Sequence, residues 1–282
     1  MNEAIRFRRA LAQSVADAYG ANEAVALVLL TGSVARELAD QHSDVELHVF
    51  WSAPPSAFAR EQPFVLAAAS ERQLWPLEDD EWSDRYLLSN LQFDLNHVLV
   101  ATGDAYLHAL LDLHEPSSAK QLLIAAITQG HLLHEREAGL HARWLARAAR
   151  YPEELRRAMV EEHLRPHPRW PQRHALAARG DLVCLHDLLL STLRTLLSAL
   201  CGLNGVYVDH PAFKWFSALC ARLTLAPERL EERLRELLRA APDAALAELE
   251  ALIDESCELV AAQMSEPLAA GARRAFAVQR NS

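Results

Sequence analysis

Asp44 and Glu46 are the residues of this 282-residue chain whose types and spacing best suit chemistry. The apolar residues of segment 45–51 alternate as in a β-strand, so the two carboxylates share one face. Residues i and i+2 of a strand lie ~6.6 Å apart, and two carboxylates at that separation repel by roughly 2.5 kcal/mol at an effective dielectric constant near 20. A bound cation would remove this repulsion, so the pair suits a divalent-cation site. Taken alone, however, so short a motif favours a solvated acidic strand face.

The segments before this pair favour the functional interpretation. Residues 25–30 form a short apolar run that ends near Gly32, which predicts a buried strand followed by a tight turn. Ser33 is suited to cap a short helix there, and the free N–H groups at a helix start suit a phosphate. Arg36 either assists phosphate binding or pairs with a neighbouring acid. Strand, Gly-Ser turn, helix and acidic strand together predict a site for a metal ion and a phosphate.

The order Gly32-Ser33, Arg36 and then Ser43-Asp44-Val45-Glu46 resembles the signature of the polymerase-beta-like nucleotidyltransferase superfamily, and within it the aminoglycoside (kanamycin-type) nucleotidyltransferases. The resemblance covers a small part of the chain. It implies that a nucleoside monophosphate passes from a nucleoside triphosphate (NTP) to a hydroxyl group of an acceptor, with release of pyrophosphate. It also implies a third carboxylate on a neighbouring strand, and two Mg²⁺ ions held by the three acids.

Asp94 is the candidate for the third carboxylate. Residues 85–88 and 91–100 are two strand-like segments around Ser89-Asn90, a pattern that predicts a β-hairpin. Asp94 is the one acid well inside a strand-like segment after Glu46, and an aspartate bonded locally on a strand face is the alternative. His97 points to the opposite face of the same strand and is expected to be structural. The predicted catalytic and metal-binding residues are therefore Asp44, Glu46 and Asp94.

The rest of the chain, from residue 104 almost to the end, has the apolar spacing of helices. The predicted fold is an α/β N-terminal nucleotidyltransferase domain in residues 1–116, with a mixed sheet and flanking helices. A C-terminal α-helical bundle in residues 117–282 is expected to bind the acceptor. Residues 75–82, which contain four consecutive acids, are expected to form a surface loop.

Further site residues are expected from the resemblance. Lys214, followed by Trp215, looks like the lysine at a helix start in helical domains of small-molecule nucleotidyltransferases, where it binds the β or γ phosphate; a surface lysine is the alternative. The predicted nucleotide-binding residues are Gly32, Ser33, Arg36 and Lys214. A general base for the acceptor hydroxyl is implied in the helical domain. Its candidates are Asp181, Asp187, Glu161 and Glu162, and a solvated helix face is the alternative for each.

Composition and charge narrow the expected partners. The net charge of -10 argues against a broad electrostatic grip on nucleic acid and is compatible with a cationic small molecule. Residues 1–9 lack the apolar core of a signal peptide, no apolar run is expected to span a membrane, and the four cysteines lack metal-type spacing. We expect a cytoplasmic enzyme, with a homodimer left open. It would use Mg²⁺ and an NTP to modify a small hydroxylated acceptor of the aminoglycoside-antibiotic type.

Two other functions fit the same sequence. One is a nucleotidyltransferase of the toxin–antitoxin type that modifies a protein or a tRNA, and the acidic balance counts against the tRNA. The other is a catalytically silent nucleotide-binding module. The presence of Asp44 and Glu46 argues against a silent module, whereas the uncertain third acid and general base argue for it.

Overall fold

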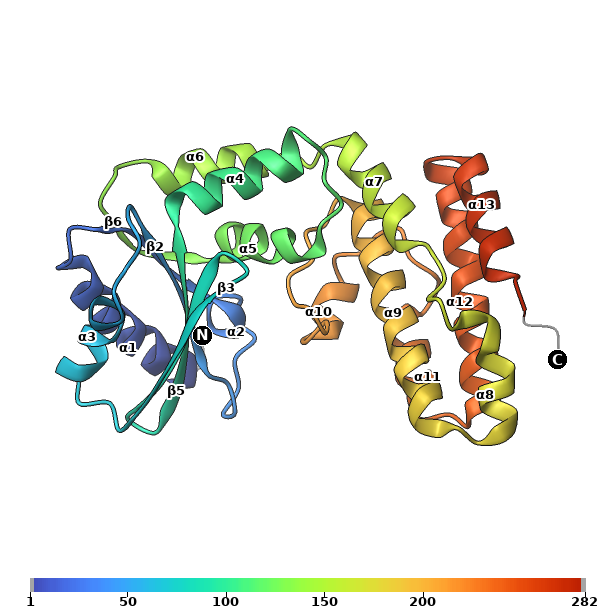
Figure 1. Cartoon of the computed structure of the whole chain (residues 1–282), viewed down its shortest axis with the longest axis horizontal. Helices are drawn as coiled ribbons and strands as arrows, with labels where there is room; N and C mark the ends of the chain where they lie inside the picture. The colour runs from blue at the N-terminus through green and yellow to red at the C-terminus, as the bar shows by residue number, and fades with distance from the viewer. Residues whose placement is uncertain (1–2, 280–282) are drawn as a thin grey trace. The chain divides into compact units, whose positions relative to one another are not determined.

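The computed structural model describes residues 3–279, which divide into two compact units (Figure 1). Within the described range, the first unit comprises residues 3–113 and Ala119–Arg150, and the second comprises His114–Ser118 and residues 151–279. The first unit contains the sheet, and the second is helical. The predicted fold class, an N-terminal mixed sheet with flanking helices and a helical C-terminal region, is confirmed.

A six-stranded sheet with the order β3-β4-β5-β2-β1-β6 forms the centre of the first unit. β2 and β5 run parallel, and every other neighbouring pair is antiparallel. β1 is buried at all its positions, in agreement with the apolar run of residues 25–30. The strands are β1 (Val25–Thr31), β2 (Val45–Trp51), β3 (Glu71–Glu78), β4 (Glu81–Leu88), β5 (Leu91–Leu99) and β6 (His131–Glu135).

Helices cover both faces of this sheet. On one face, Leu47 and Val49 of β2 belong to a core that includes residues of α1 and Phe64 of α3. On the other face, Phe50 packs edge-on against Trp144 of α6, with ring centroids 5.0 Å apart. The helices of this unit are α1 (Glu3–Gly20), α2 (Gly32–Ala35), α3 (Ala57–Leu66), α4 (Val100–Leu111), α5 (Ser118–Gln129) and α6 (Leu140–Ala148).

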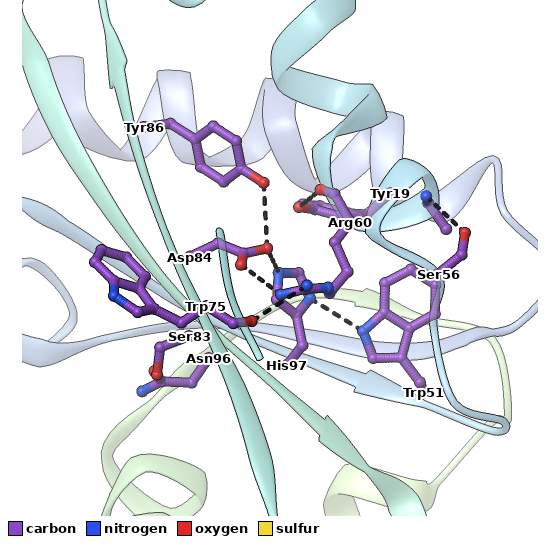
Figure 2. A network of polar contacts seen from close by, with 11 residues as sticks. Tyr19, Trp51, Ser56, Arg60, Trp75, Ser83, Asp84, Tyr86, Asn96 and His97 are labelled. Carbon is purple, nitrogen blue, oxygen red and sulfur yellow. Dashed lines mark hydrogen bonds and ion pairs between the residues drawn. The ribbon is translucent and has the colours of Figure 1, made fainter. Parts of the chain in front are cut away.

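A buried polar network on the α1 and α3 side of the sheet links α3 to three strands (Figure 2). Arg60 of α3 forms an ion pair with Asp84 of β4, which also accepts a hydrogen bond from Tyr86 at 3.2 Å. The Nε2 atom of His97 lies 3.2 Å from the Asp84 carboxylate, and Trp51 Nε1 donates to His97 Nδ1 at 3.1 Å. Because Nδ1 accepts, neutral His97 carries its proton on Nε2, toward Asp84. His97 therefore belongs to the core, on the face that its strand position predicts.

The second unit is built around α9, which packs against α7, α8 and α12. By length and composition alone, α9 is long and apolar enough to cross a membrane, which corrects the expectation that no apolar run would be. However, half of its most apolar 18-residue stretch is buried inside the structure. A core helix explains this composition. The elements are α7 (Glu153–His163), η1 (Trp170–Gln172), α8 (Arg173–Arg179), α9 (Leu182–Asn204), α10 (Phe216–Cys220), α11 (Leu230–Leu237), α12 (Pro242–Gln263) and α13 (Glu266–Phe276).

The boundary between the units differs from the one predicted between residues 116 and 117. Ala119–Arg150 groups with the first unit, because β6 pairs with β1 and α6 packs against the sheet through Trp144. β6 has only five residues, and three of them are His or Glu, so it lacks the apolar pattern of a strand. The helical spacing of the flanking residues was therefore the stronger pattern in this part of the sequence. Its strand conformation depends on pairing with β1, which is distant in the sequence.

The acidic segment 75–82 also differs from the predicted loop. It contains the end of β3, the start of β4, and a tight turn at Asp79 and Asp80, both with positive φ. β3 is an edge strand whose residues are mostly exposed, so charged side chains are compatible with strand pairing there. The hairpin predicted around Ser89-Asn90 is confirmed: both residues have positive φ, as a two-residue hairpin turn requires.

Candidate functional site

Gly32 forms the corner at which β1 ends and α2 begins. Its φ of +65° lies in the left-handed region that favours glycine. A Cβ atom at this position would lie only 2.4–2.5 Å from the carboxyl atoms of Glu46. The Glu46 carboxylate therefore rests directly against the backbone of Gly32, and a side chain at this corner would displace it.

Ser33 and Asp44 lie next to this corner along the two chain segments that meet there. Thr31 pairs with Glu46 across β1 and β2, so Ser33 lies two residues beyond one strand end and Asp44 two residues before its partner. Ser33 is only 2% exposed. Its Oγ atom and the buried Oδ1 atom of Asp44 have no hydrogen-bond partner among the described residues. Buried polar atoms are rarely left unpaired, so these two oxygens identify the corner as a candidate binding site.

The corner differs in one respect from the sequence-based expectation. Ser33 is the second residue of α2 rather than its cap, and α2 has only four residues. So short a helix has little dipole to offer a phosphate. At this corner, the hydroxyl of Ser33 and the close approach that Gly32 permits are therefore better suited to a phosphate than the start of α2.

Asp94 lies directly opposite Glu46 in the parallel pairing of β2 with β5, so the two acids share one face of the sheet. Both oxygens of Asp94 are engaged: Arg85 Nε donates to Oδ1 at 2.7 Å, and Gln92 Nε2 donates to Oδ2 at 2.8 Å. Within residues 3–279, no three His, Cys, Asp or Glu side chains are grouped so that they could hold a metal ion. The sheet brings the three predicted acids to one region, but it does not assemble them into a three-carboxylate cluster.

The donor set therefore fits a cation at Asp44 and Glu46 better than the predicted pair of ions. The orphaned Asp44 oxygen and the Glu46 carboxylate are the hard oxygen ligands that Mg²⁺ prefers. Asp94 already has a positively charged partner in Arg85. A second ion at Asp94 would require that arginine to move.

Arg85 also lies in this region, but the sequence patterns did not predict it as a site residue. It lies opposite Asp94 across β4 and β5, and its guanidinium lies 5.9 Å from the centre of the Trp75 ring. The hydrogen bond to Asp94 raises the pKa of Arg85, and the charges of Asp94 and Asp44 raise it further. Arg85 therefore lies in the field of two of the three predicted acids.

His48 continues the same face of β2 toward α6. Its Nε2 atom lies 3.3 Å from Asn96 Nδ2, a donor, and its Nδ1 atom lies 3.1 Å from Thr31 Oγ1. Nε2 therefore accepts and Nδ1 carries the proton. Burial lowers the pKa of His48 to about 4, with a smaller contribution from His97. His48 is neutral at pH 7. Its hydrogen bonds to Thr31 and Asn96 hold it beside the site, between Glu46 and Phe50 on β2.

Arg36 and Lys214 occupy different surroundings. The Nε atom of Arg36 donates to the carbonyl oxygen of Gly32 at 3.3 Å, so this side chain braces the corner. Lys214 is exposed in the second unit, in the turn before the five-residue helix α10, and its backbone N–H lies 3.2 Å from His210 Nδ1. Arg36 is thus part of the corner, whereas the phosphate role of Lys214 stays a prediction.

The four candidates for the general base are exposed residues of the second unit. Three form ion pairs with nearby arginines: Glu161 with Arg157 at 2.8 Å, Glu162 with Arg165 at 3.4 Å and Asp187 with Arg169 at 3.6 Å. Asp181 directly precedes α9 and makes no capping hydrogen bond through its side chain. These surroundings single out none of the four, and the base stays a prediction.

Three comparisons relate the chain to known proteins. Residues 117–216, which are 100 of the 282 residues, match a family model described as a domain of unknown function (DUF4037). No curated protein matches the chain. Among solved structures, the chain is similar to a nucleotidyltransferase-like protein from Exiguobacterium sibiricum 255-15, with 16% sequence identity and a TM-score of 0.39. That match covers 91% of this chain and 79% of the other.

Proposed function

We propose that this protein is a nucleotidyltransferase that moves a nucleoside monophosphate from an NTP to a hydroxyl group of a small acceptor. One observation carries the proposal: the Glu46 carboxylate rests against Gly32 at a corner that also holds the orphaned oxygens of Ser33 and Asp44. The reaction class is proposed from the resemblance of the Gly32-Ser33 and Asp44-Val45-Glu46 motif to that of nucleotidyltransferases. Asp94 supports the proposal because it lies on the same face, opposite Glu46.

Each residue of the corner has a role in this proposal. Asp44 and Glu46 would hold a divalent cation, and Mg²⁺ suits their oxygen donors. When bound, the cation neutralises negative charge on the triphosphate during transfer. Gly32 leaves room for a phosphate beside the backbone, Ser33 can donate its hydroxyl to a phosphate oxygen, and Arg36 holds the corner in place.

The acceptor and the remaining groups are proposed from the sequence. The net charge of -10 favours a cationic small acceptor, for which an aminoglycoside-type antibiotic is the leading example, and disfavours tRNA. The second unit would supply the general base, from Asp181, Asp187, Glu161 or Glu162, and a phosphate contact from Lys214. We place the reaction in the cytoplasm.

Product analysis tests the proposal. The protein is incubated with each of the four NTPs, Mg²⁺ and a panel of aminoglycosides and lincosamides, and the acceptors are then examined by mass spectrometry. The expected product is an acceptor heavier by one nucleoside monophosphate. Its formation should be lost in Asp44→Asn and retained in Asp17→Asn, which removes an exposed carboxylate from α1. Unchanged turnover in Asp44→Asn would refute the proposed site, and adducts on a macromolecule alone would favour the toxin-like alternative.

A silent nucleotide-binding module is the second candidate, and the Arg85–Asp94 ion pair favours it, because the third acid is then absent from the cation site. Calorimetric titration with NTPs, with and without Mg²⁺, separates the two functions when it is combined with product analysis. Metal-dependent NTP binding without any product on the acceptor panel or on cellular protein and RNA would support the silent module.

A further inference from the structure

The ion pair between Arg85 and Asp94 lies beside the proposed cation site. Arg85 Nε donates to Oδ1 of Asp94 at 2.7 Å, and a second guanidinium nitrogen lies 3.5 Å from Oδ2. The arginine thus reaches both oxygens that a metal ion would use. Because an arginine stays protonated at neutral pH, Asp94 is freed only when the side chain of Arg85 moves.

Movement of the Arg85 side chain away from Asp94 costs little free energy. The side chains of Arg85 and Asp94 are 48% and 31% exposed, and ion pairs with such access to water contribute little to stability. Gln92 also donates to Asp94, so this carboxylate keeps a hydrogen bond when Arg85 leaves. The guanidinium also lies 5.9 Å from the centre of the Trp75 ring, which is 41% exposed, so Arg85 has a cation–π contact in addition to its ion pair with Asp94.

Charge gives this pair a consequence for the whole site. With Arg85 in place, the ion pair balances the charge of Asp94, and the arginine also lies in the field of Asp44. When Arg85 moves away, Asp44 and Asp94 lose a positive charge that both of them face, and a bound dication replaces it with a larger one.

We propose that Arg85 is a built-in competitor for the divalent cation: it occupies Asp94 when no metal is bound and leaves this carboxylate when a cation binds. The proposal rests on the cation site of the proposed function and assigns that site a control on its metal affinity.

Mn²⁺ titration monitored by electron paramagnetic resonance tests the competition without any need for turnover. Arg85→Gln should bind Mn²⁺ roughly five- to tenfold more tightly than the unaltered chain, because one adjacent positive charge and a weak ion pair are removed. Arg85→Lys keeps the charge and should stay near the original affinity. Arg72→Gln is the matched control, because Arg72 pairs with Glu61 at nearly the same exposure, 44% and 30%, from a neighbouring strand. It should change the affinity less than twofold.

The outcomes separate the inference from its premise. If the unaltered chain binds Mn²⁺, loses it in Asp44→Asn, and binds it no more tightly in Arg85→Gln, the competitor role is refuted while the proposed site stands. Equal gains in Arg85→Gln and Arg72→Gln would show a general charge effect and would also refute it. If no variant binds Mn²⁺, both the inference and the cation site fail. Circular dichroism of each variant confirms that the fold is retained.

Discussion

Glu46 and Asp94 lie directly opposite each other across β2 and β5, yet their carboxylates have different neighbours. The Glu46 carboxylate rests against the backbone of Gly32, whereas Asp94 is held by an arginine and a glutamine. The two acids on this face therefore belong to two different groups of residues, the Gly32 corner and the Arg85 ion pair. This difference makes the contributions of the corner and of the arginine separable by mutation.

Gly32→Ala tests the corner directly. The new methyl group would meet the Glu46 carboxyl group at about 2.4 Å and displace it, so the affinity for Mn²⁺ should fall at least tenfold. The positive φ adds a loss of about 1 kcal/mol in the free energy of unfolding. Gly139→Ala is the control, because Gly139 has φ +86° and a Cβ atom added there would have nothing within 4 Å, so it shares the strain without the contact. Equal metal binding in both variants would contradict this geometry.

Ser33→Ala separates ligand binding from stability. Because Ser33 Oγ is buried without a partner among the described residues, its removal should leave the free energy of unfolding unchanged or raise it slightly. The affinity for NTP should instead fall by roughly ten- to a hundredfold, as expected for one lost hydrogen bond to a charged group. Urea unfolding and calorimetric titration measure the two effects. Ser70→Ala, at an exposed serine, should alter neither quantity; a stability loss in Ser33→Ala with unchanged NTP affinity would make Ser33 structural.

The sequence was most informative where the relevant interactions are local. The apolar run before Gly32 and the alternation after Asp44 predicted two strands and the turn between them, because burial and backbone geometry act within a few residues. The strand register that places Arg85 opposite Asp94 is local as well, although their ion pair is not read from the register. The two-residue turn at Ser89-Asn90 pairs Leu88 with Leu91. Arg85, three residues before Leu88, is therefore opposite Asp94, three residues after Leu91.

Other features depend on distant contacts and could not be predicted in this way. β6 is a strand because β1 offers its unpaired edge, and its own five residues carry no alternating pattern. The acidic residues around Asp79 and Asp80 favoured a loop prediction, because the sequence alone does not show that β3 lies at the edge of the sheet. The engagement of Asp94 follows from side-chain geometry rather than from residue types. The location of the acids was therefore predictable, and their state of pairing was not.

The buried histidines should make stability depend on pH. Burial lowers the pKa of His97 and brings that of His48 to about 4, below the value of about 6.5 in an unfolded chain. Below about pH 6.5 the unfolded state binds more protons, so the free energy of unfolding falls as the pH decreases and is retained above that pH. For His48 the loss approaches about 1.4 kcal/mol per pH unit between these two pKa values, and His97 adds a loss in the same direction. Urea unfolding between pH 7.5 and 4.5 measures the slope.

His48→Gln is the variant that checks this assignment. It removes one of the two titrating groups and should reduce the slope by about 1.4 kcal/mol per pH unit. Replacement of the exposed His42 should leave the slope unchanged. If His48→Gln unfolds with the same pH dependence as the unaltered chain, the loss of stability in acid comes from other groups.

Arg60→Ala should be the most destabilising change at a charged residue of the first unit. Both partners of the Arg60–Asp84 pair are buried, and Asp84 also contacts Tyr86 and His97 (Figure 2), so removal of the arginine leaves a buried carboxylate without its counter-ion. The expected loss in the free energy of unfolding is about 3–5 kcal/mol. Arg72→Ala breaks a half-exposed pair from a neighbouring strand and should cost less than about 1 kcal/mol. Urea midpoints measure both losses, and similar losses for the two variants would mean that burial does not govern the strength of the Arg60 pair.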